Sequence, residues 1–492
     1  MADKIMHSEV VSPYNVENNG LVTDSPFDPP EKTRWERLWP TFACGAGLFS
    51  DGYLQSAIGP VSTCFKKLYG TRYTSTNAAS NITSIAFAGT VLGQLLFGYT
   101  SDHYSRKWSL LSSTTILIVF AALSSGAYGA GGSLNGMIAA LTAYRFLLGI
   151  GIGGEYPAGS VACAESTDGF KVGHRHRWFC LFTNTQIDLG FVLGSLVPMC
   201  ITRMAGDGNL SLVWRLSLGL GVVPPLSLLY LRTKLKEPES FCRGAFRKVK
   251  TPYWLALKFY GPRLALVCGI WFIYDFLTYP FSIYSSAWVD VLEPNAALWQ
   301  TFGWSALVNF FYVPGAIFGS FTSDWLGPRR ALMVFVAAQG VVGFIMSGCY
   351  EYLKTRKNVA GFVVVYGIFL ALGEMGPGNN IGLVASKTSA TGIRGQYYAT
   401  AAALGKVGGF IGKCQYIFPY IQHAGGGADS IRGGQFPFYV ASSLCFLSAL
   451  LVWCLPDVHQ DTIETEDMRF REYLEANGFD TARIGTKGVQ ST

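Results

Sequence analysis

Apolar blocks long enough to cross a membrane recur along this chain, separated by short polar or glycine-rich segments. The hydrocarbon core of a bilayer is about 30 Å thick, so a spanning α-helix needs about 20 predominantly apolar residues. The pattern therefore predicts an all-α membrane protein with twelve transmembrane helices. We place them at residues 40–65, 81–101, 108–129, 137–164, 178–202, 211–231, 264–289, 303–324, 331–350, 359–386, 395–421 and 435–456.

The longest polar break inside this pattern runs from Lys234 to Arg263 and leaves six apolar blocks on either side. We expect it to be a loop that joins two helical bundles and contains a short amphipathic helix. The first 35 residues are polar and proline-rich, a composition typical of disorder. The predicted organisation is a disordered tail at 1–35, an N-terminal six-helix bundle at 36–233, a central loop at 234–263, a C-terminal six-helix bundle at 264–458 and a second tail at 459–492.

Lysine and arginine are concentrated in alternate loops, on the same side as the central loop. Short loops rich in these residues mark the cytoplasmic side of a membrane protein. We therefore expect both termini to lie in the cytoplasm. Asn209 then falls in an outer loop, where Asn-Leu-Ser matches a glycosylation acceptor pattern, and whether it is modified stays open.

The composition supports a membrane protein and excludes several other classes. Only 14% of the residues are charged, against about 25% in soluble domains. The net charge of +7 is spread between apolar blocks and forms no single basic patch, so we expect no nucleic-acid partner. The 11 cysteines have no zinc or redox spacing. We expect no metal, no cofactor and no enzymatic activity.

Two related motifs occupy corresponding places in the two halves. Gly93 to Lys107 reads GQLLFGYTSDHYSRK, and Gly315 to Arg330 reads GAIFGSFTSDWLGPRR. Duplicated halves are characteristic of transporters built from repeats. In each motif an acid lies where it can cap a neighbouring helix N-terminus, and the bases that follow can pair across the seam between bundles. The candidate gating residues are Asp102, Arg106, Lys107, Asp324, Arg329 and Arg330.

Five charged residues lie inside the predicted helices: Asp51, Glu155, Asp275, Glu374 and Lys406. A charge at mid-bilayer costs at least about 2.5 kcal/mol, so each is a functional candidate. A helix end or a satisfied structural ion pair is the alternative for any one of them. Five together favour a water-lined cavity, and the carboxylates Asp51, Glu155 and Asp275 become candidates for proton coupling.

The fourth and tenth helices contain glycine and proline beside these acids, at Gly149 to Pro157 and Gly373 to Gly378. Broken backbone at membrane depth is tolerated where it faces protein or a cavity, and its free N–H groups can receive an anion. Close helix packing is the alternative role of these glycines. The pattern predicts an anion site near both segments.

The seventh helix carries Trp271, Asp275 and Tyr279 at a spacing of four residues, which places them on one face. Lys406 would bring positive charge to a phosphate group there. The hydrogen-bonding candidates are Tyr156, Tyr279, Gln186 and Asn380. Asp275 would repel the anion unless it is protonated, so proton binding and phosphate binding would favour each other.

Over residues 35–460 the chain resembles the phosphate:proton symporters of the major facilitator superfamily. The segments RFLLGIGIGGEYP, WFIYDFLTYP, GPGNN and ALGKVGG correspond to that family's substrate-site segments. The resemblance implies twelve helices in two bundles and a proton path through Asp51, Glu155 and Asp275. It also implies phosphate contacts from Tyr156, Gln186, Trp271, Asp275, Tyr279, Asn380 and Lys406.

The tenth helix departs from those symporters, which usually carry an Asn-Phe-Gly-Pro-Asn run. This chain has EMGPGNN from Glu374 to Asn380, and the extra residue leaves the choice between Asn379 and Asn380 open. The stretch from Gly373 to Gly412 resembles fungal glycerophosphodiester permeases, which carry glycerophosphoinositol or glycerophosphocholine. The resemblance implies that Glu374 meets the headgroup, by charge with choline or by hydrogen bonds with inositol.

We therefore expect a monomeric, proton-coupled importer of glycerophosphodiesters in the plasma membrane, working by alternating access. Its expected partners are a small phosphodiester, protons and membrane lipids. An inorganic phosphate:proton symporter is the alternative within the same class. A non-transporting nutrient receptor is a remote alternative, because such receptors usually carry long signalling tails or loops. Headgroup preference, proton stoichiometry and affinity stay open.

Overall fold

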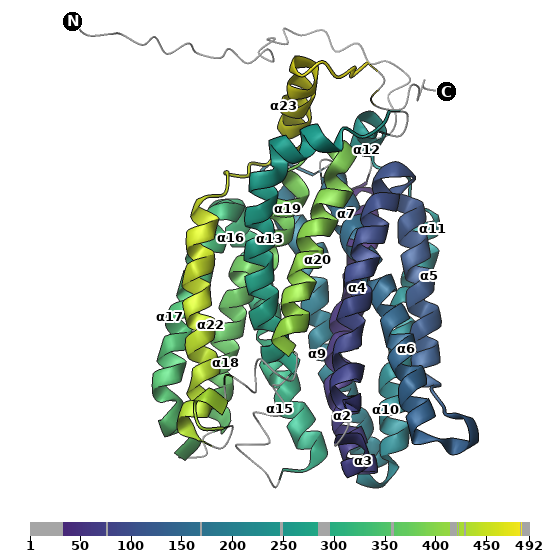
Figure 1. The fold of residues 1–492 in the computed structure, drawn as a ribbon, viewed down its shortest axis with the longest axis vertical. Coiled ribbons are helices and arrows are strands. Elements are labelled where there is room, and N and C mark those ends of the chain that lie inside the picture. The colour runs from purple at the N-terminus through teal and green to yellow at the C-terminus, as the bar shows by residue number, and fades with distance from the viewer. Residues whose placement is uncertain are drawn as a thin grey trace, which may run out of the picture.

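Every regular element in the described part of the chain is a helix, as the repeated apolar blocks predict. The computed structural model describes residues 33–74, 77–167, 170–246, 249–283, 296–355, 359–413, 421, 423–427, 430–482 and 484. Helices of the first half stand beside helices of the second half in Figure 1, and all run roughly parallel to one long axis. The predicted tail at 1–35 lies almost wholly outside the described residues.

The N-terminal half forms one group of helices. Its main elements are α1 (Arg34–Gly45), α2 (Phe49–Tyr69), α4 (Ala78–His103), α5 (Arg106–Ser125), α6 (Leu134–Gly154), α7 (Val161–Ser166), α8 (Arg175–Phe182), α9 (Asn184–Ala205), α10 (Leu210–Gly219) and α11 (Val223–Thr233). A π-helical segment, η3 (Glu155–Ser160), joins α6 to α7.

The C-terminal half repeats this arrangement after the short helix α12 (Glu239–Gly244). Its main elements are α13 (Tyr253–Ile283), α15 (Leu298–Phe310), α16 (Tyr312–Trp325), α17 (Pro328–Thr355), α18 (Val359–Gly373), α19 (Asn379–Lys387), α20 (Arg394–Lys413) and α22 (Ile431–Trp453). The π-helical segment η7 (Glu374–Gly378) joins α18 to α19. A further helix, α23 (Thr462–Ala476), follows the bundle within the predicted second tail.

Ten helices among the described residues are long and apolar enough to cross a membrane. The predicted blocks at 40–65 and 395–421 are missing from this set, because α2 and α20 are more polar than the rest. These two helices carry Asp51 and Lys406. The helix predicted at 264–289 begins earlier, at Tyr253, and its last six positions fall outside the described residues.

The predicted breaks at Glu155 and Glu374 are wide π-helical turns inside continuous helices. Such turns are frequent at functional sites because they re-aim side chains without ending the helix. Glycines nearby serve close packing: a Cβ added at Gly153 of α6 would overlap the Thr90 carbonyl of α4. Close helix packing, the alternative role of these glycines, is therefore observed, and a π-helical turn occurs in the same segment.

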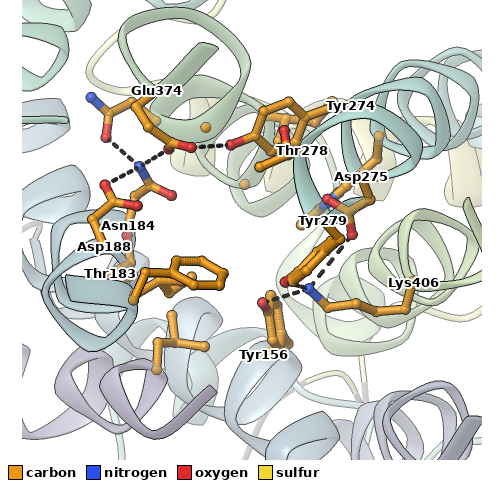
Figure 2. Close-up of a pocket in the computed structure, with 18 of the residues that line it drawn as sticks. Tyr156, Thr183, Asn184, Asp188, Tyr274, Asp275, Thr278, Tyr279, Glu374 and Lys406 are labelled. Carbon is orange, nitrogen blue, oxygen red and sulfur yellow. Dashed lines mark hydrogen bonds and ion pairs between the residues drawn. The ribbon is translucent and has the colours of Figure 1, made fainter. Parts of the chain in front are cut away.

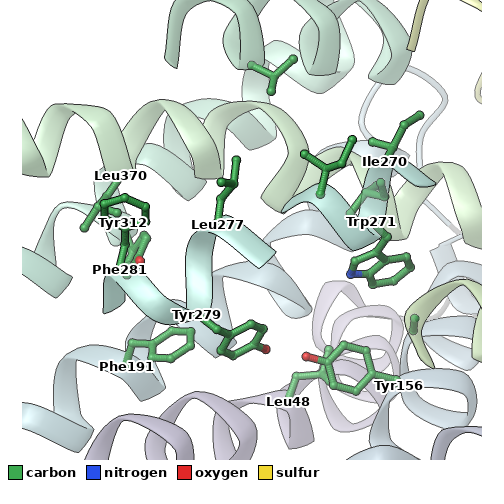
Figure 3. Packing of buried hydrophobic residues seen from close by; sticks show 14 of the residues in the cluster. Leu48, Tyr156, Phe191, Ile270, Trp271, Leu277, Tyr279, Phe281, Tyr312 and Leu370 are labelled. Carbon is green, nitrogen blue, oxygen red and sulfur yellow. The ribbon is translucent and has the colours of Figure 1, made fainter. Parts of the chain in front are cut away.

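The largest buried apolar cluster extends through both halves. In Figure 3, Tyr156 of η3 and Tyr279 of α13 face each other with their hydroxyl groups pointing toward the space between them. The ring of Phe87 on α4 packs edge-on against Tyr279 with centroids 4.9 Å apart. The interface between the halves is therefore buried and aromatic around a small polar centre.

Candidate functional site

A closed cavity lies between the two bundles. Its free volume is about 50 Å³, whereas pockets that enclose drug-sized ligands measure about 300–1,000 Å³. In this conformation the cavity holds little more than water. Seven of the predicted substrate-site residues line it: Tyr156, Trp271, Asp275, Tyr279, Glu374, Asn379 and Lys406.

One side of the cavity is built around the Lys406 ammonium (Figure 2). Its Nζ lies 3.5 Å from Asp275 Oδ2 and 3.6 Å from Asp51 Oδ2. It also donates to the hydroxyl of Tyr156 at 2.8 Å and to that of Tyr279. The Tyr156 hydroxyl in turn donates to Asp51 Oδ2 at 2.5 Å. We call these five residues the lysine cluster; it contains groups from both bundles.

Glycines of α20 bring the lysine cluster together. A Cβ added at Gly405 would overlap the Trp271 indole, and one at Gly408 would overlap the Phe272 carbonyl. Small residues let helices approach closely in a membrane, so α20 can lie directly against α13. This contact positions Lys406 beside Asp275.

The other side of the cavity is built around the Asn184 amide (Figure 2). Its Nδ2 donates to Glu374 Oε2 at 2.8 Å, to Asn379 Oδ1 at 3.2 Å and to Asp188 Oδ2 at 3.3 Å. The Tyr274 hydroxyl donates to Glu374 Oε1 at 2.6 Å. We call these five residues the acid–amide cluster. Asn184 and Asp188 come from α9, so this cluster also joins the two bundles.

Gly378 makes room for the acid–amide cluster. A Cβ at this position would overlap Glu374 Oε2 and would lie 2.8 Å from the Tyr274 hydroxyl. The extra glycine in the EMGPGNN run therefore gives space to the carboxylate of Glu374, one helical turn earlier.

Three other predicted site residues do not line the cavity. The Gln186 amide donates to the Leu181 carbonyl at 3.2 Å. Asn380 accepts a hydrogen bond from Ser323 at 2.8 Å and donates to the Gly376 carbonyl. Asp51 lies behind the Tyr156 hydroxyl and reaches the cavity through it.

Glu155 lies away from the cavity in a buried ion pair. Its two carboxylate oxygens meet Arg232 Nη1 and Nη2 at 2.7 Å and 2.6 Å, and Ser113 also donates to it. Both partners are at most 1% exposed. In this conformation the charge of Glu155 is balanced inside the N-terminal bundle, as in the structural ion pair that is the alternative for each intramembrane acid.

Several residues of these clusters were absent from the sequence prediction. Asp188 lies inside a predicted helix, so the rule that flagged Asp275 would also have flagged it. The rule for charged residues does not apply to Asn184 and Tyr274. Their side chains are uncharged, and amides and tyrosines are common near membrane cavities. Arg232 lies just beyond the predicted helix at 211–231, so it fell in the loop that follows that helix.

The electrostatics of the cavity are unusual for an anion site. With one ammonium and four carboxyl groups, the ionised lysine and acid–amide clusters together carry a net charge of −3. A buried charge needs a partner or a neutralising proton. An anion beside Lys406 would therefore be repelled by these carboxyl groups unless some of them are neutralised.

The acids of the two loop motifs cap helices of the opposite bundle. Asp102, near the end of α4, accepts backbone N–H bonds from Gly395 and Gln396 at 2.8 Å each, at the start of α20. Asp324, near the end of α16, pairs with Arg177 Nε at 3.1 Å and accepts from its backbone N–H. Carboxylates are favourable at helix N-termini. Asp102 and Asp324 thus both hold the two bundles together at the same end of the molecule.

The bases of the two motifs differ in their contacts. Arg106 pairs with Asp102 at 2.6 Å and with Glu165 at 3.2 Å, and Glu165 also pairs with Arg394 of α20. Arg329 pairs with Asp457 of its own half at 3.2 Å. Arg106 therefore pairs with acids of its own half, and the ion pair that crosses the seam here is Glu165 with Arg394. Arg106 reaches the other half through the Thr391 carbonyl, to which its Nη2 donates at 3.4 Å.

Lys107 and Arg330 form no ion pair with another residue in the part of the chain that the structure describes. The Lys107 backbone N–H donates to Glu237 at 3.4 Å, and Arg330 is exposed at the rim of a surface hollow that also contains Asp324.

Two helical bundles around a closed polar cavity are the architecture of a membrane transporter. The similarity of the chain to known proteins supports this interpretation. The family model described as "Sugar (and other) transporter" matches residues 41–248 and 243–470. A solved proton:xylose symporter has the same fold, with a TM-score of 0.72 at 15% identity over 88% of this chain and 99% of that one. The chain belongs to this transporter family, is a multi-pass membrane protein and is not an enzyme. The predicted major facilitator fold is confirmed.

Two relatives from Candida albicans are much more similar in sequence. The chain is 48% identical to a glycerophosphocholine permease over 462 residues, which cover 93% of this chain and 86% of the relative. It is 46% identical to a major glycerophosphoinositol permease over 472 residues, which cover 95% of this chain and 87% of the relative. The predicted resemblance to fungal glycerophosphodiester permeases is confirmed.

Proposed function

We propose that this chain is a proton-coupled importer of glycerophosphodiesters in the plasma membrane. The observation that carries the proposal is the position of Lys406, a buried ammonium in a closed cavity between two bundles of a transporter fold. The curated relatives transport substrates that share a phosphodiester. That group bears one negative charge, which Lys406 complements.

Substrate binding would exchange partners at Lys406. The ammonium now has two carboxylates, Asp51 and Asp275, within 3.6 Å. A phosphodiester that approaches the ammonium adds a third negative charge to the same space. Protonation of one carboxyl group removes the repulsion. Each substrate that enters would therefore bring a proton with it, and both would leave on the other side.

Alternating access is supported by contacts at both ends of the seam. At one end, Asp102 holds the start of α20. Toward the other end, Asn309 of α15 donates to Ser195 of α9 at 3.0 Å (Figure 1). The cavity is too small for a diester in this state, so one set of contacts must open for loading and the other for release. We propose that the Asp102 end faces the cytoplasm and that the chain acts as a monomer.

The test is uptake of labelled glycerophosphocholine and glycerophosphoinositol by fungal cells that lack their own diester permeases. Cells that express the chain should accumulate at least one diester, a protonophore should collapse the accumulation, and excess inorganic phosphate should compete weakly. Uptake of inorganic phosphate, with uptake of neither diester, would instead show that the chain is an inorganic phosphate symporter. Signalling by the wild-type chain without any uptake would indicate a receptor.

A further inference from the structure

The cavity has unlike charges on its two sides. Lys406 occupies one side, while Asp188 and Glu374 occupy the other (Figure 2). We infer that the acid–amide cluster binds a cationic headgroup, so that the favoured substrate is a zwitterionic glycerophosphodiester of the choline kind. This inference rests on the proposed function, which places the phosphodiester beside Lys406.

Charge balance is the first argument. Lys406 is the one basic residue among the described residues that line the cavity, and Asp188 and Glu374 are 1% and 2% exposed. Neither acid pairs with a base in the described contacts. Two buried carboxyl groups that contribute nothing to phosphate binding are costly to keep. A headgroup cation offsets one of these two negative charges.

Hydrogen-bond geometry is the second argument. Each oxygen of Glu374 already accepts one hydrogen bond, from Asn184 or from Tyr274, and Asp188 accepts one from Asn184. A carboxylate oxygen can accept a second hydrogen bond, so these donors do not exclude a polyol. A quaternary ammonium has no N–H to donate and needs only negative charge and apolar surface. The cluster therefore accommodates a quaternary ammonium without any change in its hydrogen bonds.

Aromatic surface is the third argument. Tyr274, Phe179 and Phe191 line the same cavity. Aromatic faces attract quaternary ammonium groups, most strongly when the site is desolvated. Carboxylates beside aromatic side chains are thus the groups expected around a choline headgroup.

The two sides line one cavity and meet at consecutive residues of α13. Tyr274 contacts Glu374, while Asp275 contacts Lys406. Successive residues of a helix point about 100° apart, so the two contacts diverge from nearly the same height of the helix. A ligand with separate anionic and cationic groups would therefore meet both sides.

The decisive probe is an uncharged copy of the substrate. In the 3,3-dimethylbutyl ester of glycerophosphate, a carbon replaces the choline nitrogen, so shape is kept and charge is lost. Competition against labelled glycerophosphocholine uptake by the wild-type chain should show the isostere to be at least about tenfold weaker than unlabelled glycerophosphocholine. Equal competition by the two compounds would overturn the inference, and this comparison needs no variant.

Two variants then assign the effect to residues. Asp188→Asn and Glu374→Gln keep side-chain size and remove one charge each. In either variant the isostere should approach glycerophosphocholine in potency, while competition by glycerophosphoinositol should change little. Glu239→Gln is the matched control, because Glu239 is an exposed carboxylate whose side chain is 85% exposed. Surface labelling must show comparable amounts of each protein.

The outcomes separate this inference from the proposed function. If no diester is taken up by the wild-type chain, the proposed function fails. If diesters are taken up but the wild-type chain does not distinguish the charged ester from its isostere, only the headgroup inference fails. If that distinction survives unchanged in both variants, the acid–amide cluster has another role and the inference is overturned.

Discussion

Lys406 of α20 donates to the hydroxyl of Tyr156, which belongs to the opposite bundle, across 2.8 Å. The same ammonium contacts Asp275 of its own bundle and Asp51 of the other. A ligand that replaces any of these contacts changes how the two bundles hold each other. Binding at the Lys406 ammonium can therefore change the relative position of the two bundles.

Lys406→Ala should abolish uptake while the protein still reaches the cell surface. The substitution removes the cation that receives the phosphodiester and leaves Asp51 and Asp275 without their ammonium. Removing one partner of a buried charge pair costs about 2–5 kcal/mol, so uptake at fixed substrate should fall by about hundredfold. Lys258→Ala is the control, because Lys258 is an exposed lysine of α13. Near-normal affinity in Lys406→Ala would contradict the anion site.

Asp275→Asn should uncouple transport from the proton gradient. An amide cannot take up a proton, so the gradient-driven accumulation is lost, and exchange may be measured separately by counterflow. In the wild-type chain, uptake should increase as external pH falls toward about 5, because protonation of the cavity carboxyl groups relieves repulsion of the anion. Glu472→Gln on α23 is the control for loss of an exposed acid. Wild-type uptake that ignores both pH and a protonophore would indicate a facilitator.

Asp102→Asn should weaken the closed state at the proposed cytoplasmic end. The carboxylate accepts from the backbone of Gly395 and Gln396, and loss of its charge at this helix N-terminus costs about 0.3–2 kcal/mol. Cys180 of α8 is fully buried and donates to the Asn379 carbonyl beside the cavity. Its labelling by a permeant maleimide, read by mass spectrometry of its peptide, should become faster. Unchanged labelling would show that Asp102 does not control this opening.

Gly378→Ala should impair diester uptake without unfolding the bundle. The added methyl group would overlap Glu374 Oε2, so the carboxylate must leave the Asn184 amide. Overpacking of this kind typically costs about 1–3 kcal/mol, and we expect about a tenfold loss of uptake at low substrate. Gly348→Ala is the matched control, because no atom lies within 4 Å of its added Cβ. Equal effects of the two substitutions would exclude a special role for Gly378.

Glu155→Gln should lower thermal stability, because it leaves the Arg232 guanidinium buried without its carboxylate. Breaking a buried pair on one side costs about 3–5 kcal/mol, whereas replacing both partners by apolar residues is often neutral. The double variant Glu155→Leu with Arg232→Met should therefore recover most of the stability. If it also recovers proton-driven uptake, Glu155 does not belong to the proton path; if stability returns without coupling, the predicted proton role is supported.

The helices and the lysine cluster could be predicted because their signals are local. Block length predicts the spans, and the spacing of Trp271, Asp275 and Tyr279 predicts one lining face. The polar character of α2 and α20, which weakens their membrane signal, is itself a consequence of carrying Asp51 and Lys406 at the centre.

The remaining features depend on contacts between distant segments. The partner of Glu155 lies 77 positions away, at the end of α11, and no local pattern pairs the two. The hydrogen bond from Asn184 to Glu374 joins residues 190 positions apart. Gln186 and Asn184 are both amides of one helix, and only the packing of α9 decides which of them faces the cavity.

The most direct test of the central claim uses purified protein in liposomes that enclose a pH-sensitive dye. An inward gradient of glycerophosphocholine, imposed with no starting pH difference and with membrane potential clamped, should drive protons inward and acidify the lumen. Lys406→Ala liposomes should show no such change. Acidification that follows substrate in the wild-type chain is the predicted result, and substrate entry with no movement of protons would contradict coupled transport through this cavity.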